Sequence, residues 1–227
     1  MMRRILLQLT ALLAVVWLAG CGTGASDRND ASPSASGTAT ASSTSTSSTA
    51  SPAASPTASV APAGNEAALS AAKDIVEALR DRDLKRLSSW IDPEQGLRFS
   101  PYAAMTESDQ LFKPDSLPSF KSTDKVNWGT ADGSGEPIEL TFRDYYDKFV
   151  YDKDFDSAPS VTAGKLIGQG NTVYNGQDIY PGSSFVEFHF PGSDDTSGMD
   201  WESLIVTLVQ SDGEWRLVAL THAQWTI

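Results

Sequence analysis

A tract of small and polar residues most constrains what this chain can fold into. Between residues 22 and 64 almost every residue is Ser, Thr, Ala, Pro or Gly, and no large apolar side chain occurs before Val60. A segment of this composition cannot bury enough apolar surface to offset the entropy lost on folding. We therefore expect a disordered tether over residues 22–64, with a root-mean-square span of about 35 Å, and one globular domain over residues 65–227.

The amino-terminal stretch has the pattern of an export signal. Arg3-Arg4 precedes an apolar run over residues 5–18, and small residues then lead to Cys21. The run is shorter than the roughly 20 residues of a membrane-spanning helix, which favours a signal peptide over residues 1–20. The Leu-Ala-Gly-Cys sequence that ends at Cys21 resembles a bacterial lipoprotein lipobox. This resemblance implies cleavage before Cys21, lipidation of its thiol, and anchoring to the bacterial membrane, facing the cell wall or periplasm.

Two alternatives to a lipid anchor are an ordinary secretory signal and an uncleaved anchor, in both of which Cys21 plays no part. Cys21 is the only cysteine of the chain. A mature exported domain therefore has no disulfides and depends on its apolar core for stability. Cysteine nucleophiles and cysteine metal ligands are excluded for the same reason. We predict no cofactor and no metal ion for the folded domain.

The excess of acidic residues limits which partners the domain can bind. The chain has 29 Asp and Glu against 17 Lys and Arg. A nucleic-acid-binding surface needs clustered Lys and Arg that replace phosphate counterions, so we expect no nucleic-acid partner. Anionic lipid headgroups would also repel the acidic surface of this domain. The lipid on Cys21 is therefore the predicted contact with the membrane, and the acidity of the domain mainly serves solubility.

The folded domain begins with helical periodicity and ends with strand periodicity. Apolar residues at helical spacing predict a first helix, and Asp83 predicts the cap of a second, short helix. Thr141, with Asp144 three residues later, predicts the cap of a third helix with an aromatic stripe. The two stripes comprise Leu69, Ala72, Ile75, Val76 and Leu79, and Phe142, Tyr145, Tyr146 and Phe149. Strands are predicted at 126–128, 161–167, 172–174, 184–190, 204–210 and 215–222, with a hairpin turn at 211–214.

Helices first and strands afterwards predict an α+β fold, in which the helices pack on a largely antiparallel sheet that ends in a long hairpin. This element order resembles the NTF2-like (SnoaL-like) cone, which implies a pocket between the concave sheet face and the helices. Short stretches are also similar to an uncharacterised family of bacterial extracytoplasmic proteins, and this similarity implies a location and a fold. These stretches are Arg98-Phe-Ser-Pro-Tyr-Ala103, Trp128-Gly129, Asp132-Gly-Ser-Gly-Glu-Pro-Ile138, Gly198-Met-Asp-Trp-Glu-Ser203 and Gln224-Trp-Thr-Ile227.

The most informative polar residues lie on two predicted strands. Alternation places Glu187 and His189 on one face of the strand at 184–190, beside Phe185. The same alternation places His222 on one face of the last strand with Arg216, Val218, Leu220 and Gln224. If both faces line the pocket of a cone, Glu187, His189 and His222 converge there as a ligand-binding site. A carboxylate and two imidazoles can hold water or transfer a proton; the alternative is a structural role for both histidines.

Other motifs are weaker. Asp152-Lys-Asp-Phe-Asp156 begins like an EF-hand loop but lacks its later Gly and Glu. A solvated acidic turn is the favoured interpretation, and a looser Ca²⁺ site is the alternative. That site would use these acids or a second group, Asp194, Asp195, Asp200 and Glu202. Five tryptophans suit either a sugar- or lipid-binding groove or the core, and the core is favoured: Trp90, Trp128, Trp201, Trp215 and Trp225.

These observations favour a membrane-anchored extracytoplasmic lipoprotein whose domain is a binding or interaction module for a small molecule or an envelope component. A second hypothesis is a metal-independent enzyme of NTF2-like type that uses Glu187, His189 and His222 for acid–base chemistry. A third is a structural envelope protein without a pocket. Convergence of buried polar groups would favour the enzyme, an exposed apolar groove the binding module, and a filled cone the structural role.

Overall fold

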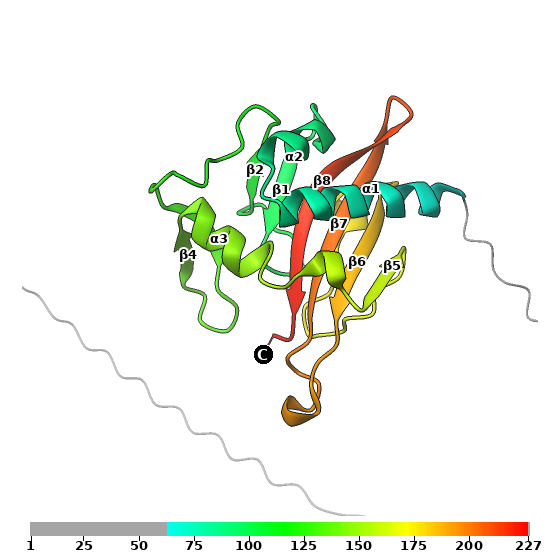
Figure 1. Cartoon of the computed structure of the whole chain (residues 1–227). Coiled ribbons are helices and arrows are strands. Elements are labelled where there is room, and N and C mark those ends of the chain that lie inside the picture. Colours follow the sequence, from blue (N-terminus) through cyan, green and yellow to red (C-terminus); the bar gives the residue numbers. More distant parts are fainter. Residues whose placement is uncertain (1–62, 227) are drawn as a thin grey trace, which may run out of the picture. The chain divides into compact units, whose positions relative to one another are not determined.

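The computed structural model describes residues 63–226 (Figure 1). The predicted signal peptide, Cys21 and nearly all of the predicted tether lie outside these residues. The helices are α1 (Ala63–Arg80), α2 (Leu84–Trp90), α3 (Phe142–Phe149) and α4 (Gly176–Ile179), with short 3₁₀ turns at Phe155–Ser157 and Asp194–Thr196. The strands are β1 (Leu97–Ser100), β2 (Gln110–Phe112), β3 (Val126–Thr130), β4 (Pro137–Leu140), β5 (Ser160–Ala163), β6 (Ser184–Phe190), β7 (Glu202–Ser211) and β8 (Glu214–Gln224).

Six of the strands form one sheet in the order β2-β1-β8-β7-β6-β5, and β3 pairs with β4 separately. Neighbours in the large sheet are antiparallel, except that β1 runs parallel to β8. The chain therefore has the predicted α+β fold with a largely antiparallel sheet and a long terminal hairpin. At that hairpin Asp212 and Gly213 both have positive φ, 52° and 79°, as a two-residue turn of type I′ requires.

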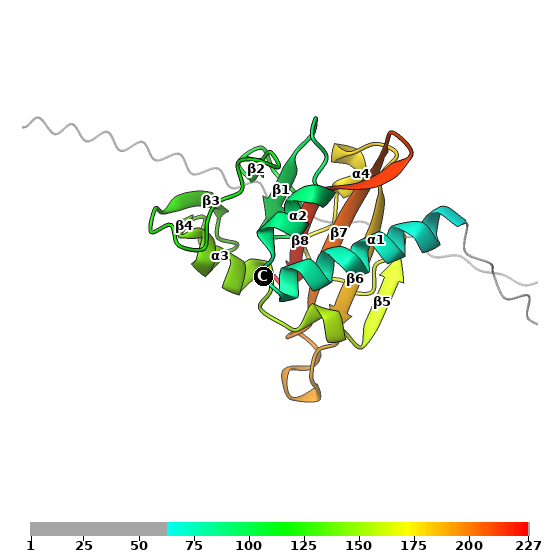
Figure 2. The ribbon, with the colours of Figure 1, turned by 45° about the horizontal axis from the view of Figure 1, so that its top comes forward.

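Helix α1 crosses one face of this sheet (Figures 1 and 2). Its predicted apolar stripe is buried, apart from Leu69, which is partly buried. The stripe belongs to the same core as the side chains that β6, β7 and β8 direct to this face, here called the helix face. The helix face comprises Val186, Phe188, Leu204, Val206, Leu220 and His222.

The opposite face, here called the loop face, is covered by loops rather than helices. It comprises Phe185, Glu187, His189, Ser203, Ile205, Thr207, Thr221 and Ala223. Leu166 and Tyr174, from the segment between β5 and β6, pack on its apolar members, and the Tyr174 hydroxyl lies 2.8 Å from Thr207 Oγ1. Both faces of the central strands are therefore buried, which explains why β7 is buried along most of its length.

Aromatic side chains fill much of the helix side of the molecule. Trp128 and Tyr145 stack with ring centroids 4.0 Å apart, and Phe99 packs edge-on against both. The indole Nε1 of Trp128 donates to the Leu140 carbonyl at 2.9 Å. Since Trp128, Tyr145 and Phe99 are completely buried, this region stabilises the fold by packing and leaves little room for a ligand.

The predicted helix caps are confirmed. The Asp83 carboxylate accepts from the Arg86 backbone N–H at 2.9 Å, at the start of α2. Thr141 accepts from the Asp144 backbone N–H at 3.2 Å and donates from its hydroxyl to the Asp144 carboxylate at 2.8 Å, at the start of α3. Each cap satisfies a backbone donor that the first helical turn leaves free.

One predicted strand is too long, and another is absent. The strand predicted at 161–167 ends at Ala163, because Gly164 turns the chain with a positive φ of 68°. The strand predicted at 172–174 is a loop. In it the Thr172 hydroxyl lies 2.8 Å from the hydroxyl of Thr226, and Tyr174 bonds to the loop face. Strands β1, β2 and β4 were not predicted, because their short sequences lie among turn residues and pair with distant segments.

A β-bulge breaks the alternation that was assumed for the last strand. Thr207 pairs with Ala219, and the next residue, Leu208, pairs with Leu217. Val218 therefore has no pairing partner on β7 and is the extra residue of the bulge. Val218 and Ala219 both join a cluster on the loop side with Met105. The prediction that Val218 shares a face with His222 is therefore wrong.

Candidate functional site

The three residues that were expected to converge lie on opposite faces of the sheet. In the register of the sheet, Glu187 pairs with Ile205, whereas His222 pairs with the preceding residue of β7, Leu204. Because successive residues of a strand point to opposite faces, Glu187 and His189 lie on the loop face and His222 lies on the helix face. The expected three-residue site is therefore two separate clusters.

The first cluster centres on Glu187, whose side chain is fully buried. Its Oε1 atom accepts from the Ser203 hydroxyl at 2.7 Å and from the Gly168 backbone N–H at 3.0 Å. Its Oε2 atom accepts from the Ile167 backbone N–H. An ionised carboxylate can only accept hydrogen bonds. These three donors therefore offset the free-energy cost of removing it from water.

The position of the Ser203 hydrogen determines the tautomer of His189. His189 Nδ1 lies 2.8 Å from Ser203 Oγ. Since Ser203 donates its only hydroxyl hydrogen to Glu187, the Nδ1 atom must carry a hydrogen and donate to Ser203. In neutral His189 the Nε2 atom is then left with a free lone pair.

Electrostatics keep His189 neutral near pH 7. Burial lowers the pKa of the His189 imidazole, and the Glu187 carboxylate, 3.9 Å from Nδ1, opposes this shift in part. The result is a neutral ring held in one orientation by Ser203, with Nε2 able to accept a hydrogen bond or a proton.

Two hollows adjoin Trp201 on the loop face, each of about 280 Å³. Trp201, Gly168 and Gln169 border both. The apolar hollow is otherwise lined by Ala103, Leu166, Gly170, Thr172, Val173, Tyr174, Ile205 and Ala223. The histidine hollow is otherwise lined by Ile167, His189, Pro191, Gly192 and Gly198. Val173, at the edge of the first hollow, is 73 % exposed, so apolar surface is open to solvent beside the histidine.

Gly168 is needed where the loop between β5 and β6 meets this cluster. A Cβ atom at this position would lie 2.4 Å from the Trp201 ring and 3.0 Å from Glu187 Oε1. The close approach lets the Gly168 N–H reach the Glu187 carboxylate while the Trp201 ring covers the loop. The loop therefore both satisfies the buried acid and forms the border between the two hollows.

The second cluster lies on the helix side and joins His222 to two acids. Asp152 follows α3, Glu202 begins β7, and His222 is near the end of β8. His222 Nε2 lies 3.2 Å from Asp152 Oδ2, and one ligand atom from each of the three residues lies within 4.8 Å of the others. His222 is 1 % exposed, and Phe149 packs edge-on against its ring.

The two acids of this cluster have opposite pKa shifts. Burial, and then the neighbouring Asp152 carboxylate, raise the pKa of Glu202. Burial alone would also raise the pKa of Asp152, but the hydrogen bond and charge of His222, and after them the neighbouring Glu202, outweigh it and lower that pKa. Asp152 is therefore the stronger acid of the pair, and Glu202 is the member that retains a proton more readily.

The other acids of the suggested Ca²⁺ sites have separate structural roles or none in the structure. Asp154 accepts from Tyr151 and Ser157, and Asp156 pairs with Arg80. Asp200 accepts from the Ser193 backbone N–H and hydroxyl and from Thr196, which closes the turn before β7. The three carboxylates of the EF-hand-like stretch therefore do not converge.

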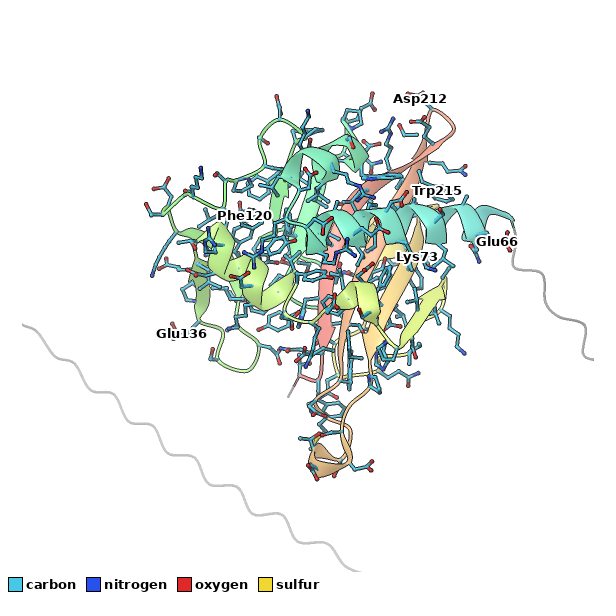
Figure 3. All side chains as sticks on the ribbon, in the orientation of Figure 1. Glu66, Lys73, Phe120, Glu136, Asp212 and Trp215 are labelled. Atoms are coloured by element: carbon cyan, nitrogen blue, oxygen red, sulfur yellow. The ribbon has the colours of Figure 1, made fainter. Side chains whose placement is uncertain are left out.

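The tryptophans divide between core and surface. Trp128 is fully buried and Trp201 nearly so, whereas Trp225 is 38 % exposed. Trp90 and Trp215 are partly buried against the core and line a third hollow of about 530 Å³ between α1, α2 and the β7–β8 hairpin. Figure 3 shows Trp215 at this hairpin, near α1. The predicted core role therefore holds for Trp128 and Trp201 but not for Trp225.

Sequence reasoning missed the residues that connect each cluster. Ser203 was not singled out, because an isolated serine gives no local signal; only its place opposite His189 reveals its role. Asp152 and Glu202 were noted as acids, but nothing in the sequence paired them with His222.

No protein-family model matches the chain, and no curated protein matches it. Among solved structures, it is similar to a protein of Xanthomonas campestris described as a calcium/calmodulin dependent protein kinase II association domain. The match has 14 % sequence identity and a TM-score of 0.28, and it covers 76 % of this chain and 92 % of that one. Nothing further follows from so low a score. Within residues 63–226, no helix is long and apolar enough to cross a bilayer.

Proposed function

We propose that this chain is an extracytoplasmic lipoprotein, anchored through Cys21, whose NTF2-like domain binds a small molecule or an envelope component. The lipobox and the low-complexity tether support the anchor. Helix α1 across a sheet made chiefly of the β5–β8 meander supports the NTF2-like arrangement. The proposed ligand site lies on the loop face, at the two hollows beside Trp201, because His189 borders one of them.

The observation that carries this proposal is that His189, whose Nδ1 is held by Ser203, borders a hollow next to exposed apolar surface. Small-molecule sites are mostly apolar and contain a few polar groups that orient the ligand. Here Trp201, Val173 and Leu166 supply the apolar surface, and His189 supplies one oriented acceptor. The matching ligand is a compact molecule with an apolar ring and a hydroxyl group that donates to Nε2.

The test is a titration of the full chain, made soluble by Cys21→Ser, with 4-ethylphenol, followed by NMR at the Gly168 and Gln169 amides. We expect saturable binding with a dissociation constant of about 0.1–1 mM, in keeping with the small energy available per ligand atom. The methyl ether, 4-ethylanisole, cannot donate a hydrogen bond and should bind more weakly. Saturation without shifts at these two amides, or no saturation by either compound, would contradict the proposed site.

Acid–base catalysis is a second candidate function. The observation that favours it is the chain of bonds from Glu187 through Ser203 to His189, which fixes the tautomer and orientation of a histidine base. This form of the hypothesis uses Glu187 and His189 but not His222, which lies on the other face. The test is the rate at which the ring hydrogens of a bound phenol exchange with solvent. Catalysis is favoured over binding alone if this exchange is faster than for free phenol in the parent chain, and is not faster with the His189→Phe variant.

A further inference from the structure

We propose that Asp152, Glu202 and His222 form a binding site for a divalent transition-metal ion of the zinc class. The three residues come from segments far apart in the sequence and meet on the helix side of the sheet. This site is separate from the proposed ligand site, which lies on the loop face, and it does not depend on that proposal. It departs from the expectation of a metal-free domain.

The spacing of the ligand atoms suits a small divalent ion. Zinc binds carboxylate oxygen and imidazole nitrogen at about 2.0–2.2 Å, so two ligand atoms of a tetrahedral site lie about 3.3 Å apart. Asp152 Oδ2 and His222 Nε2 are already 3.2 Å apart. The Glu202 oxygen lies within 4.8 Å of both, so a shift of about 1–1.5 Å would complete three ligands.

The donor set selects the class of ion. Imidazole suits Zn²⁺, Cu²⁺, Fe²⁺ and Ni²⁺, whereas Ca²⁺ and Mg²⁺ prefer oxygen ligands alone. His222 is 1 % exposed and its Nε2 atom points at Asp152, so the nitrogen is already oriented by the fold. Two carboxylates and one imidazole leave a fourth position for water.

An independent observation is the unmatched oxygen of Glu202. Its Oε2 atom is buried and has no hydrogen-bond partner among the described residues. The Lys153 ammonium lies 3.3 Å away, an ion-pair distance without hydrogen-bond geometry. A buried carboxyl oxygen without a partner is costly, and a cation bound between Asp152 and Glu202 would remove this cost.

Lys153 and the second nitrogen of His222 both limit the affinity. The Lys153 side chain is 41 % exposed, so it can swing into solvent, but its charge competes with the ion for Glu202. His222 Nδ1 has no hydrogen-bond partner within residues 63–226, although metal-bound histidines usually donate from this nitrogen to an acceptor. Loss of such a partner weakens metal binding about 10–100-fold, so we expect a micromolar rather than a nanomolar dissociation constant.

The experiment is titration of the full Cys21→Ser chain with Zn²⁺ by calorimetry, and with Co²⁺ by visible absorption, which reports tetrahedral coordination. We expect one ion per chain. Asp152→Asn should weaken Zn²⁺ binding at least tenfold, whereas Lys153→Met should tighten it severalfold, because the competing cation is gone. Asp195→Asn is the matched control, since Asp195 is an exposed acid outside the cluster, and it should change nothing.

The two variants keep the test decisive. Circular dichroism establishes that each variant is folded, and the gain expected for Lys153→Met cannot arise from misfolding. Absence of one-to-one Zn²⁺ binding by the folded parent chain would overturn the proposal. Equal effects of Asp152→Asn and Asp195→Asn, or no gain with Lys153→Met, would place any bound ion elsewhere and overturn it as well. Unchanged 4-ethylphenol binding in the presence of Zn²⁺ would support two separate sites.

Discussion

Ser203 shows how much a single residue can contribute to this molecule. It donates to the buried Glu187 carboxylate and accepts from His189, so one hydroxyl on β7 joins two ionisable groups of the adjacent strand β6. Networks of this kind stabilise a fold only when every member is satisfied. His189 and Glu187 therefore depend on a residue whose type alone gives no hint of a role.

Replacement of Ser203 by alanine should destabilise the domain by about 1–3 kcal/mol, because it leaves buried polar atoms of Glu187 and His189 without a partner. Urea denaturation would measure the loss. Ser157→Ala is the matched control, since Ser157 also donates to a carboxylate, that of Asp154, but on the exposed surface. The control should lose no more than about 0.5 kcal/mol. Equal losses in the two variants would show that the buried network has no special weight.

The stability of the domain should fall as the pH drops below about 6.5, partly because of His189. Burial gives this imidazole a folded-state pKa below its ordinary value of 6.5. The unfolded chain then binds the proton more readily, so protonation favours unfolding as the pH falls through this range. Glu187, the charged group facing the ring, reduces the effect without reversing it.

Melting temperatures of the parent chain and of His189→Gln, measured between pH 7.5 and 5, would check this. All other ionisable groups are common to both proteins, so the difference between the two curves isolates His189. The parent chain should lose more stability on acidification than the variant. Parallel curves would mean that the pKa of His189 is the same in the folded and unfolded states.

At the scale of elements, the loop between β5 and β6 decides where a ligand site can form. It covers the loop face of the sheet, supplies the Ile167 and Gly168 N–H groups to Glu187, and packs under Trp201. Gly164 starts the loop by ending β5. A strand that continued through residue 167, as its alternation predicted, would leave Glu187 without two of its three donors.

Gly168→Ala should cost about 1–3 kcal/mol, because the added methyl group would overlap the Trp201 ring and force the loop outward. Gly170→Ala is the comparison, since a Cβ atom there meets Trp201 at 3.3 Å rather than 2.4 Å. Thermal unfolding should give a lower melting temperature for Gly168→Ala than for Gly170→Ala. A Gly168→Ala chain as stable as the Gly170→Ala chain would indicate that the loop is not held against the ring.

At the scale of the whole molecule, the sheet separates two polar clusters. The aromatic core on the helix side stabilises the domain, and the space there is occupied by Trp128, Tyr145 and their neighbours. The loop side carries the smaller apolar clusters and the two hollows beside Trp201. Without disulfides, the domain needs the large apolar area of this core to be stable.

The proposed anchor is also testable at this scale. Cys21→Ser should move the protein from the membrane fraction to the soluble fraction of bacteria that express it, because no lipid can then be attached. Ser26→Ala, just beyond the lipobox, is the control and should remain with the membrane. A Cys21→Ser protein that still sediments with the membrane would contradict the lipid anchor.

Features that depend on neighbouring residues alone were predictable from the sequence. The α1 stripe, the caps at Asp83 and Thr141, the turn at 211–214 and strands β6, β7 and β8 all follow from local spacing and local hydrogen bonds. The shared face of Glu187 and His189 is of the same kind, because two residues of one strand need no partner to define it.

The sheet face on which His222 lies cannot be predicted from local spacing, and only the tertiary structure decided it. Its face depends on the register between β7 and β8, and a shift of one residue moves every side chain of a strand to the other face. A bulge at Val218 adds such a shift within β8 itself. The parallel pairing of β1 with β8 and the meeting of Asp152 with His222 likewise join distant segments. Local patterns predict elements, whereas the pairing of distant strands determines which residues meet.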